Sequence, residues 1–224
     1  MPRQPESVNT EMSRLTISAG SSDKEEPKFH PLRTEWTMWY LDDHKQKNWM
    51  ERLHEVHTFD TIEVFWSLMN AVPAPSRLNH ACDYNVFRNK IQPVWEEPEN
   101  KDGGRWLIET DQRMEADQIN LIWTEILMAM IGEQFGQDSD NICGIVCNVR
   151  NKGSKISVWT SDADDRDANT RIGHVLKEKL MDLELPDGRR PVFSALRYEV
   201  HEDVQQKTSS LAPIRSTLVI RNSH

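Results

Sequence analysis

Cysteine is scarce in this chain, and its few cysteines do not make up a disulfide framework. Cys82, Cys143 and Cys147 are the only three among 224 residues. Small secreted domains are usually held together by several cysteine pairs, so this usage favours a reducing compartment inside the cell. Cys143 and Cys147 fall on one predicted strand with a separation of roughly 13 Å. That separation is too long for a disulfide between them.

A surplus of positive charge is also missing. The chain has 36 acidic side chains against 27 basic ones, which gives a formal net charge of -9. Proteins that bind long nucleic acids neutralise many phosphates with a broad basic surface. The composition excludes such a surface, so any contact with nucleic acid is expected to be short and local.

Long hydrophobic runs and familiar catalytic arrangements are absent from the sequence as well. No apolar stretch approaches a membrane span and the first residues lack a signal-peptide core, so a soluble cytoplasmic protein is expected, with the nucleus left open. No Ser-His-Asp set, glycine-rich phosphate loop or carboxylate pair stands out. His54 and His57 have a spacing that occurs in metal sites, but no further ligand accompanies them. We therefore expect no enzymatic activity, no cofactor and no bound metal.

Tryptophan, by contrast, is abundant, with eight residues against three tyrosines and six phenylalanines. One of the eight lies in residues 141–160, which predict two strands joined by a short turn. Residues 142–150 and 155–160 alternate in polarity, and residues 151–154 have the composition of a tight hairpin loop. If Arg150 and Lys155 close this loop, the apolar face pairs Val149 with Ile156 and Cys147 with Val158.

The opposite face of this hairpin has an unusual composition. It presents Asn148, Arg150, Lys155, Ser157 and Trp159. Two cations and an indole are poor core material, and they suit an anionic ligand that has an aromatic part. The alternative is an outer sheet face with scattered charges, and the hairpin alone does not decide between the two.

The rest of the chain alternates between polar segments and strand patterns. Residues 1–28 are polar and predict a disordered tail. Residues 36–41 predict a strand with Trp36 and Met38 on one face and Trp39 on the other. The polar loop after this strand ends at Trp49, which we expect to be exposed on a loop. Further strands are expected at 83–87, 105–108, 192–200 and 217–221, with a proline-bracketed loop at 92–98 and a mobile loop at 201–216.

Three helices are expected among these strands. Residues 60–63 have the form of a capping box, in which Glu63 reaches back to the start of a helix that ends near Ala71. The longest helix is predicted at 118–135 with Asp117 as its cap, and the third at 166–183. The pattern predicts an α+β fold: a curved antiparallel β-sheet with about three long helices on its convex face, in one domain over 29–224. The tryptophans expected in its core are Trp36, Trp39, Trp106 and Trp123.

Several short blocks, in order and at nearly constant spacing, resemble the eukaryotic translation initiation factor 4E family. The resemblance covers about residues 29–180 and continues weakly to the C-terminus. No single block is decisive, but the ordered set is specific. The blocks are His30-Pro31-Leu32 with Trp36 and Trp39, residues 59–66, Pro93-Val94-Trp95-Glu96, Gly103-Gly104-Arg105-Trp106, Ile131-Gly132-Glu133, and Cys143-Gly144 through Asn148-Val149-Arg150 to Trp159-Thr160.

This resemblance implies a protein that holds the 7-methylguanosine cap of messenger RNA in the mouth of a curved sheet. Methylation at N7 makes the base cationic, so it stacks well between two indoles, and Trp49 and Trp95 match those positions. Glu96 would accept the N1–H and N2–H₂ donors of guanine. Trp159 matches the family residue that contacts the N7-methyl group.

The resemblance also implies contacts to the phosphates of the cap. The hairpin face described above had already brought two cations and Trp159 together without reference to any family. The matching phosphate contacts are Arg105, Arg150 and Lys155, with Lys152 as an addition.

A second surface is implied for protein partners. Family members bind a helical Tyr-x-x-x-x-Leu-apolar motif, carried by the initiation scaffold and by repressors that mimic it. Thr124 departs from the pattern, because the family usually has leucine there, and the loss of apolar area weakens docking by roughly 1 kcal/mol or more. Ser209 and Ser210 lie near the family's regulatory phosphorylation site, but the spacing assigns neither. The matching partner positions are His30, Pro31, Ile62, Trp66, Glu125 and Met128, with Trp66 as the expected anchor.

Three functions follow from these residues. The first is a factor that binds capped messenger RNA and recruits the scaffold to start translation, as a monomer outside the initiation complex. The second is a cap-binding paralogue that acts as a repressor or tissue-specific variant with weakened scaffold binding. Thr124 favours it, whereas Trp49 argues against the divergent repressor branch, where another aromatic is expected. The third is an enzyme that acts on capped or free nucleotides.

Overall fold

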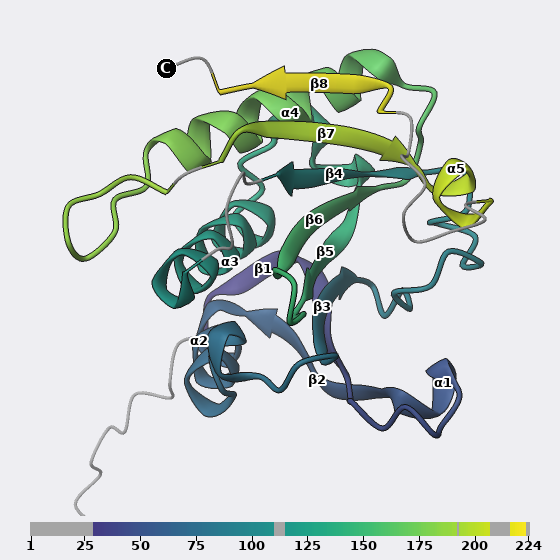
Figure 1. The fold of residues 1–224 in the computed structure, drawn as a ribbon, viewed down its shortest axis with the longest axis vertical. Coiled ribbons are helices and arrows are strands. Elements are labelled where there is room, and N and C mark those ends of the chain that lie inside the picture. Colours follow the sequence, from purple (N-terminus) through teal and green to yellow (C-terminus); the bar gives the residue numbers. More distant parts are fainter. Residues whose placement is uncertain (1–28, 110–114, 192, 207–215, 223–224) are drawn as a thin grey trace, which may run out of the picture.

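The computed structural model describes residues 29–109, 115–191, 193–206 and 216–222. The predicted tail and most of the predicted mobile loop, including Ser209 and Ser210, lie outside the described residues. Within them, eight antiparallel strands form one sheet in the order β2-β1-β3-β5-β6-β4-β7-β8 (Figure 1). The strands are β1 (Pro31–Leu41), β2 (Leu53–Thr61), β3 (Asp83–Arg88), β4 (Gly104–Glu109), β5 (Ile142–Asn148), β6 (Lys155–Thr160), β7 (Ala195–Val200) and β8 (Leu218–Arg221).

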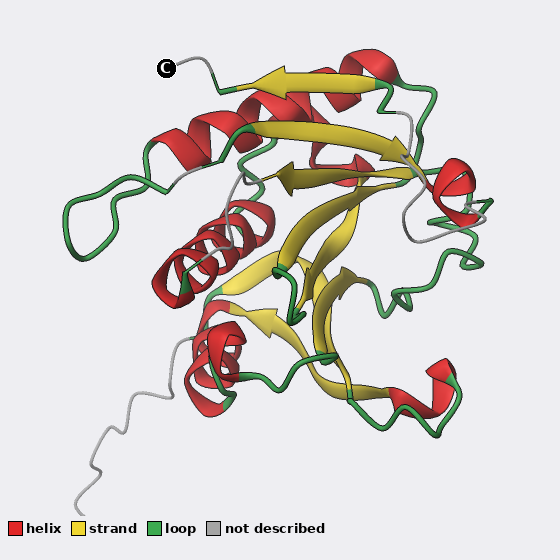
Figure 2. Cartoon of the chain, viewed as in Figure 1, coloured by secondary structure: helices red, strands yellow, loops and turns green. Residues whose placement is uncertain are grey.

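Three longer helices cover one face of the sheet, as Figure 2 shows. They are α2 (Ile62–Ala71), α3 (Ala116–Ile131) and α4 (Arg166–Met181). Two short helices, α1 (Trp49–Arg52) and α5 (His201–Gln205), lie on the other side, together with the long β3–β4 connection (Figure 1). Two 3-10 turns, η1 (Pro75–Arg77) and η2 (Gly136–Asn141), complete the order. This arrangement confirms the predicted α+β fold, with a curved antiparallel sheet and three long helices on its convex face.

The main core fills the space between the sheet and the three helices. Alternation along β1 directs Trp36 and Met38 into it, and Trp106 and Trp123 join them from β4 and α3. Trp39 points to the opposite face of the sheet, where it belongs to a smaller buried cluster with Phe87 and Trp159. All four tryptophans predicted as core are buried. The buried stripe of α3 is also as predicted: Ile119, Ile122, Trp123, Ile126, Leu127, Met130 and Ile131.

The β5–β6 hairpin forms where it was predicted, but with a different register. Cys147 pairs with Ile156 and Asn148 with Lys155, two residues away from the predicted pairing. The reason is that Val149 leaves the hairpin: its backbone bonds to Cys82 and Ala81, in the connection that precedes β3. Because the slip is two residues and strand faces alternate every residue, each side chain keeps its predicted face.

The capping box predicted for the first long helix is wrong. The N-cap of α2 is Thr61, whose Oγ1 accepts the Val64 backbone N–H at 3.3 Å. The Glu63 carboxylate instead accepts from His30, at 3.0 Å from the backbone nitrogen and 2.6 Å from Nδ1. Glu63 therefore attaches the start of β1 to the helix.

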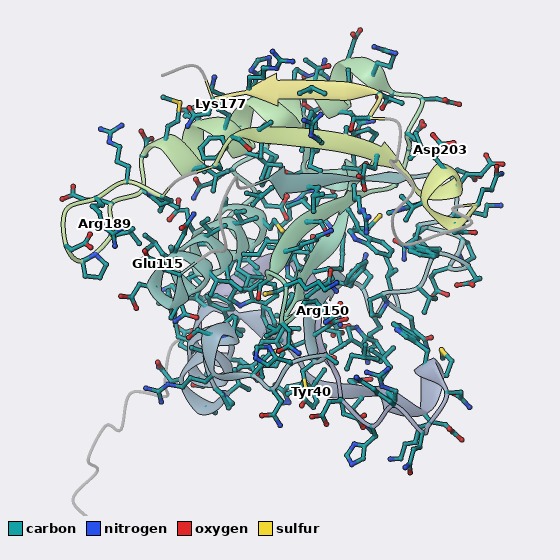
Figure 3. All side chains as sticks on the ribbon, viewed as in Figure 1. Tyr40, Glu115, Arg150, Lys177, Arg189 and Asp203 are labelled. Carbon is teal, nitrogen blue, oxygen red and sulfur yellow. The ribbon has the colours of Figure 1, made fainter. Side chains whose placement is uncertain are left out.

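The predicted ends of α3 also need correction. Asp117 lies in the first turn and is not the cap, and the cap residue Glu115 receives its side-chain hydrogen bond from Arg189 at 2.8 Å (Figure 3). The helix ends at Ile131, four residues early, because Glu133 adopts a left-handed conformation with φ of 53°. A side chain in that conformation interrupts an α-helix.

Two further segments differ from the sequence-based expectation. Strand β2 is not predicted from sequence, because only Phe59 is buried along it and no alternation is visible. The beginning of the predicted mobile loop is helical: it forms α5, and His201 is completely buried. His201 thereby becomes part of the cavity's surroundings.

Candidate ligand-binding site

A cavity of about 710 Å³ opens on the face of the sheet that the long helices leave uncovered. A volume of this size suits a nucleotide-sized ligand. Its walls combine two tryptophan-bearing segments with side chains from the strands between them. The lining residues are Trp49, Met50, Asp83, Asn85, Gln92, Pro93, Val94, Trp95, Glu96, Arg105, Val146, Asn148, Arg150 and Trp159.

Trp49 stands at one side of the cavity and is 39% exposed. Its predicted exposure is confirmed, but it begins the short helix α1 and does not lie in a loop. Asn48 caps this helix: its side chain accepts from the Glu51 backbone at 2.9 Å, and Glu51 accepts from the Asn48 backbone at 3.0 Å. This reciprocal capping box gives a four-residue helix a defined start.

Asp42 lies at the start of the segment that carries Trp49 and is hydrogen-bonded to residues at its end. Its buried carboxylate accepts from His54 Nε2 at 2.9 Å and from the His44 backbone at 2.8 Å. Arg52 Nε donates to the Asp42 carbonyl at 2.8 Å, and the Asp42 N–H donates to the Arg52 carbonyl at 3.0 Å. The hydrogen bond from His54 is the main cause that holds the pKa of Asp42 well below its usual range.

Trp95 lies in the β3–β4 connection, whose backbone is held by hydrogen bonds from one of its own side chains. The buried side chain of Asn100 donates to the carbonyls of Gln92 at 3.0 Å and Val94 at 2.8 Å. Trp95 itself is half-buried and packs against the smaller cluster, while Glu96 is exposed beside it. The connection therefore holds an indole and a carboxylate next to each other at the cavity wall.

Trp159 forms the deep part of the cavity and is only 5% exposed. Its ring meets Phe87 edge to face at 5.4 Å between centroids and lies 4.2 Å from the His201 ring. Gly144, opposite Trp159 in the ladder, makes room for this packing, since a Cβ there would come within 2.5 Å of the Phe87 ring. Trp159 is thus fixed in place from both sides.

Two arginines line the cavity, and each is paired with a buried acid. Arg105 donates from Nε and Nη2 to one oxygen of Glu199, at 3.0 and 2.8 Å. Arg150, near the β5–β6 turn in Figure 3, donates from Nη2 to Asp83 at 3.1 Å, and a second bond joins its Nη1 to the same carboxylate. The arginines are consequently held in fixed orientations.

Most of the predicted ligand residues share this cavity, and some lining residues were missed. Lys152 and Lys155 are exposed and are not among the lining residues, whereas all six other predicted cap residues are. Asp83 and Asn85 were missed, whereas Asn148 was expected on the ligand-facing side of the hairpin without an assigned contact. Their polarity could have indicated their place in the site, because Asp83 and Asn85 are alternate residues of a predicted strand and therefore share one face.

The predicted partner residues lie on the side of α2 and α3, away from the cavity. Ile62 and Trp66 are 43% and 41% exposed, unusually large values for such apolar side chains. Trp66 leans edge to face on the buried Phe65 at 4.9 Å, and the Ile62 backbone donates to the His30 carbonyl at 3.0 Å. On α3, Thr124, Glu125 and Met128 are half-buried. Pro31 is exposed at the start of β1.

Comparison with known proteins decides the family. A family model described as eukaryotic initiation factor 4E matches residues 31–215. The chain belongs to this family. Eukaryotic translation initiation factor 4E-1 of Caenorhabditis elegans is 54% identical over 189 residues, which cover 84% of this chain and 89% of that protein. This 4E-family chain therefore matches a curated relative over most of both sequences.

Solved structures of 4E proteins agree with the fold. The complex of C. elegans eIF4E-3 with the 4E-binding protein Mextli and a cap analog is 41% identical, covers 86% of this chain and 100% of that one, and gives a TM-score of 0.73. Ascaris suum eIF4E-3 in complex with the m7G cap is 40% identical, with coverage of 88% and 100% and a TM-score of 0.75.

Two further observations concern the described part of this 4E-family chain. Its residues contain no group of three or more His, Cys, Asp or Glu side chains that could hold a metal ion. The helices described are each too short or too polar to cross a membrane.

Proposed function

We propose that this protein binds the 7-methylguanosine cap of messenger RNA and recruits the initiation scaffold in the cytoplasm, where translation starts. The single observation that supports this most strongly is the cavity that combines Trp49, Trp95 and Glu96 with two oriented arginines. Membership in the 4E family and the cap complexes of its relatives support the same function.

The base is recognised by charge and by hydrogen bonding. A cationic 7-methylguanine enters between Trp49 and Trp95, where stacking contributes about 1–3 kcal/mol per base and the cation–π attraction adds about 0.5–2 kcal/mol. Glu96, exposed beside Trp95, accepts the N1–H and N2–H₂ donors of guanine. Adenine lacks that donor pair, so Glu96 selects guanine. Trp159 contacts the N7-methyl group from the deep end of the cavity.

The phosphates follow the base toward the arginine-bearing strands. Arg105 and Arg150 supply fixed guanidinium donors, which are suited to phosphate oxygens. Lys152 and Lys155 are exposed near the hairpin turn and add mobile positive charge at the entrance.

Partners bind on the opposite side by a helix-in-groove mode. The apolar residues of a Tyr-x-x-x-x-Leu-apolar helix cover Trp66 and Ile62, whose exposed area otherwise has no structural role. His30, Pro31, Glu125 and Met128 complete the contact surface. The complex of C. elegans eIF4E-3 with the 4E-binding protein Mextli supports the binding of a protein partner.

Fluorescence titration tests the cap site directly. Adding 7-methyl-GTP should quench intrinsic tryptophan fluorescence strongly, while GTP should have little effect. Trp95→Ala should weaken binding by on the order of tenfold or more, because one stacking partner is lost. Trp66→Ala is the matched control, since it removes an exposed indole from the other surface and should leave the titration unchanged. Equal quenching by both nucleotides would contradict the proposal.

A second candidate, a cap-binding repressor or tissue-specific variant, is favoured by Thr124. This residue is half-buried on α3 beside Glu125, within the proposed partner surface. Thr124→Leu restores apolar area and should tighten binding of a scaffold-type peptide by about fivefold, which corresponds to roughly 1 kcal/mol. Isothermal titration with wild type and variant measures it. Unchanged affinity would remove the reason for this second candidate.

We expect no turnover of the bound cap. A capped dinucleotide incubated with the protein should be recovered intact by chromatography. Release of any nucleotide would instead support the enzyme hypothesis.

A further inference from the structure

Arg105 already has a charged partner within the protein. Glu199 lies directly opposite it in the β4–β7 ladder and is only 6% exposed. Both Nε and Nη2 of Arg105 donate to the same Glu199 oxygen, at 3.0 and 2.8 Å. A buried pair fixed by strand register is part of the fold and persists without a ligand. Arg105 has five N–H donors, so its remaining donors stay available to the cavity that it lines.

The histidine next to this pair adds no charge to it. His201, two residues after Glu199, is fully buried against Trp159. Burial, together with the nearby Arg105, lowers the pKa of His201 to about 3, so its ring is neutral at physiological pH. It neither repels Arg105 nor neutralises Glu199.

The charged groups that line the cavity, counted with their ion-pair partners, do not favour an anion; the exposed Lys152 and Lys155 are not among the lining residues. Asp83 pairs with Arg150 and Glu199 with Arg105, and Glu96 is a further acid at the wall. Three carboxylates therefore accompany two guanidinium groups. A polyphosphate that reaches Arg105 must also approach the carboxylate that holds it.

We propose that Glu199 limits the affinity of this site for phosphate groups, so that discrimination between nucleotides rests on the base. The inference depends on the proposed cap-binding function and adds a residue that tunes it. Because Glu199 offsets the charge of Arg105, the triphosphates of GTP or ATP gain little binding energy from the site alone. A ligand is retained only when its base also stacks between Trp49 and Trp95 and bonds to Glu96.

The test varies the number of phosphates on the ligand. Glu199→Gln keeps an oxygen that accepts from Arg105 but removes the negative charge. Affinities are measured by fluorescence for 7-methylguanosine and its mono-, di- and triphosphates. The variant should bind 7-methylguanosine with wild-type affinity. Relative to wild type, its affinity should rise by about threefold or more for each added phosphate charge. The affinity for GTP should rise by the same factor as the affinity for 7-methyl-GTP. The ratio of the two affinities therefore stays constant while binding of unmethylated nucleotide increases.

Two control variants separate this effect from general changes. Glu199→Asp keeps the charge and should show no gain for the triphosphate. Asp138→Asn removes a comparably buried acid, one that accepts from Arg171 at 2.7 and 2.8 Å away from the cavity, and should change no nucleotide affinity. Thermal unfolding of all three variants shows whether each is folded at the temperature of the titrations.

The outcomes are distinguishable. A gain that is equal for all four methylated ligands, no gain, or a loss that grows with phosphate number would overturn the role of Glu199. Failure of wild-type protein to bind 7-methyl-GTP would instead overturn the proposed function itself.

Discussion

His201 is a buried imidazole whose two ring nitrogens have no hydrogen-bond partner among the described residues. Burial without a partner disfavours the charged ring, which lowers the pKa of His201 from 6.5 to about 3. The ring is retained in the fold as a neutral, flat group against Trp159. It therefore links the stability of the protein to pH.

The direction of the pKa shift of His201 determines how stability changes with pH. Between about pH 6.5 and pH 3 the unfolded chain binds a proton at His201 that the folded protein does not. Stability should therefore fall as pH falls through this window, by up to about 1.4 kcal/mol per pH unit. Urea unfolding at pH 7.5, 6.0 and 5.0 measures it, and His201→Phe should remove this part of the slope.

A matched histidine controls for the rest of the molecule. His57 is exposed on β2, so His57→Gln should leave the pH dependence of unfolding as it is in wild type. Identical slopes for His201→Phe and wild type would show that His201 is not the cause.

The sequence predicted part of the site, Arg150 and Trp159 from the hairpin pattern and the remaining residues from the family resemblance. Trp49, Trp95, Glu96, Arg105, Arg150 and Trp159 were expected and do line one cavity. Glu199 and His201 were not expected, because their roles arise from cross-strand register and from the path of the chain after β7. Neither is visible in local polarity.

At the scale of single elements, the segment 43–51 presents Trp49 through very few contacts. Its two ends meet at the Asp42–Arg52 backbone and side-chain bonds, and Asp42 also receives hydrogen bonds from His44 and His54. Helix α1 has no buried residue of its own. The position of Trp49 should therefore depend on Asp42 more than on packing.

Asp42→Asn tests this dependence. The substitution keeps the shape but removes the charge that strengthens the hydrogen bonds from both histidines, which weakens the closure of the segment by about 1 kcal/mol. We expect 7-methyl-GTP to dissociate about fivefold faster in stopped-flow fluorescence, with little change in the association rate. Asp43→Asn removes the same charge one residue later and should behave as wild type. Equal kinetics for the two variants would mean that Asp42 does not position Trp49.

Element boundaries were predicted well where periodicity is strong and poorly where tertiary contacts decide. The strand from Lys155 to Thr160 and the buried stripe of α3 follow from spacing alone. The hairpin register and the cap of α2 do not, because Val149 and Glu63 each find partners distant in sequence. The edge strand β2 gives no alternation to detect.

At the scale of the whole molecule, one sheet separates two surfaces. The main core and the long helices lie on one face, with Ile62 and Trp66 exposed beyond them. The cavity and the smaller cluster lie on the other face. No described residue that lines the cavity belongs to the predicted partner set. Eight hydrogen-bonded strands form one continuous sheet between the two sides.

The two ligands should consequently bind at the same time. Coupling between distant sites requires an element with two arrangements that both ligands bias, and it typically amounts to about 1–3 kcal/mol where it exists. The continuous sheet offers no such element between α2 and the cavity, so a saturating Tyr-x-x-x-x-Leu-apolar peptide should change the dissociation constant of 7-methyl-GTP by less than about threefold. Fluorescence titration with and without peptide measures this. Trp66→Ala should abolish binding of the peptide while the affinity for 7-methyl-GTP stays constant. Displacement of 7-methyl-GTP by the peptide would show instead that the two surfaces overlap or that the sheet transmits a conformational change.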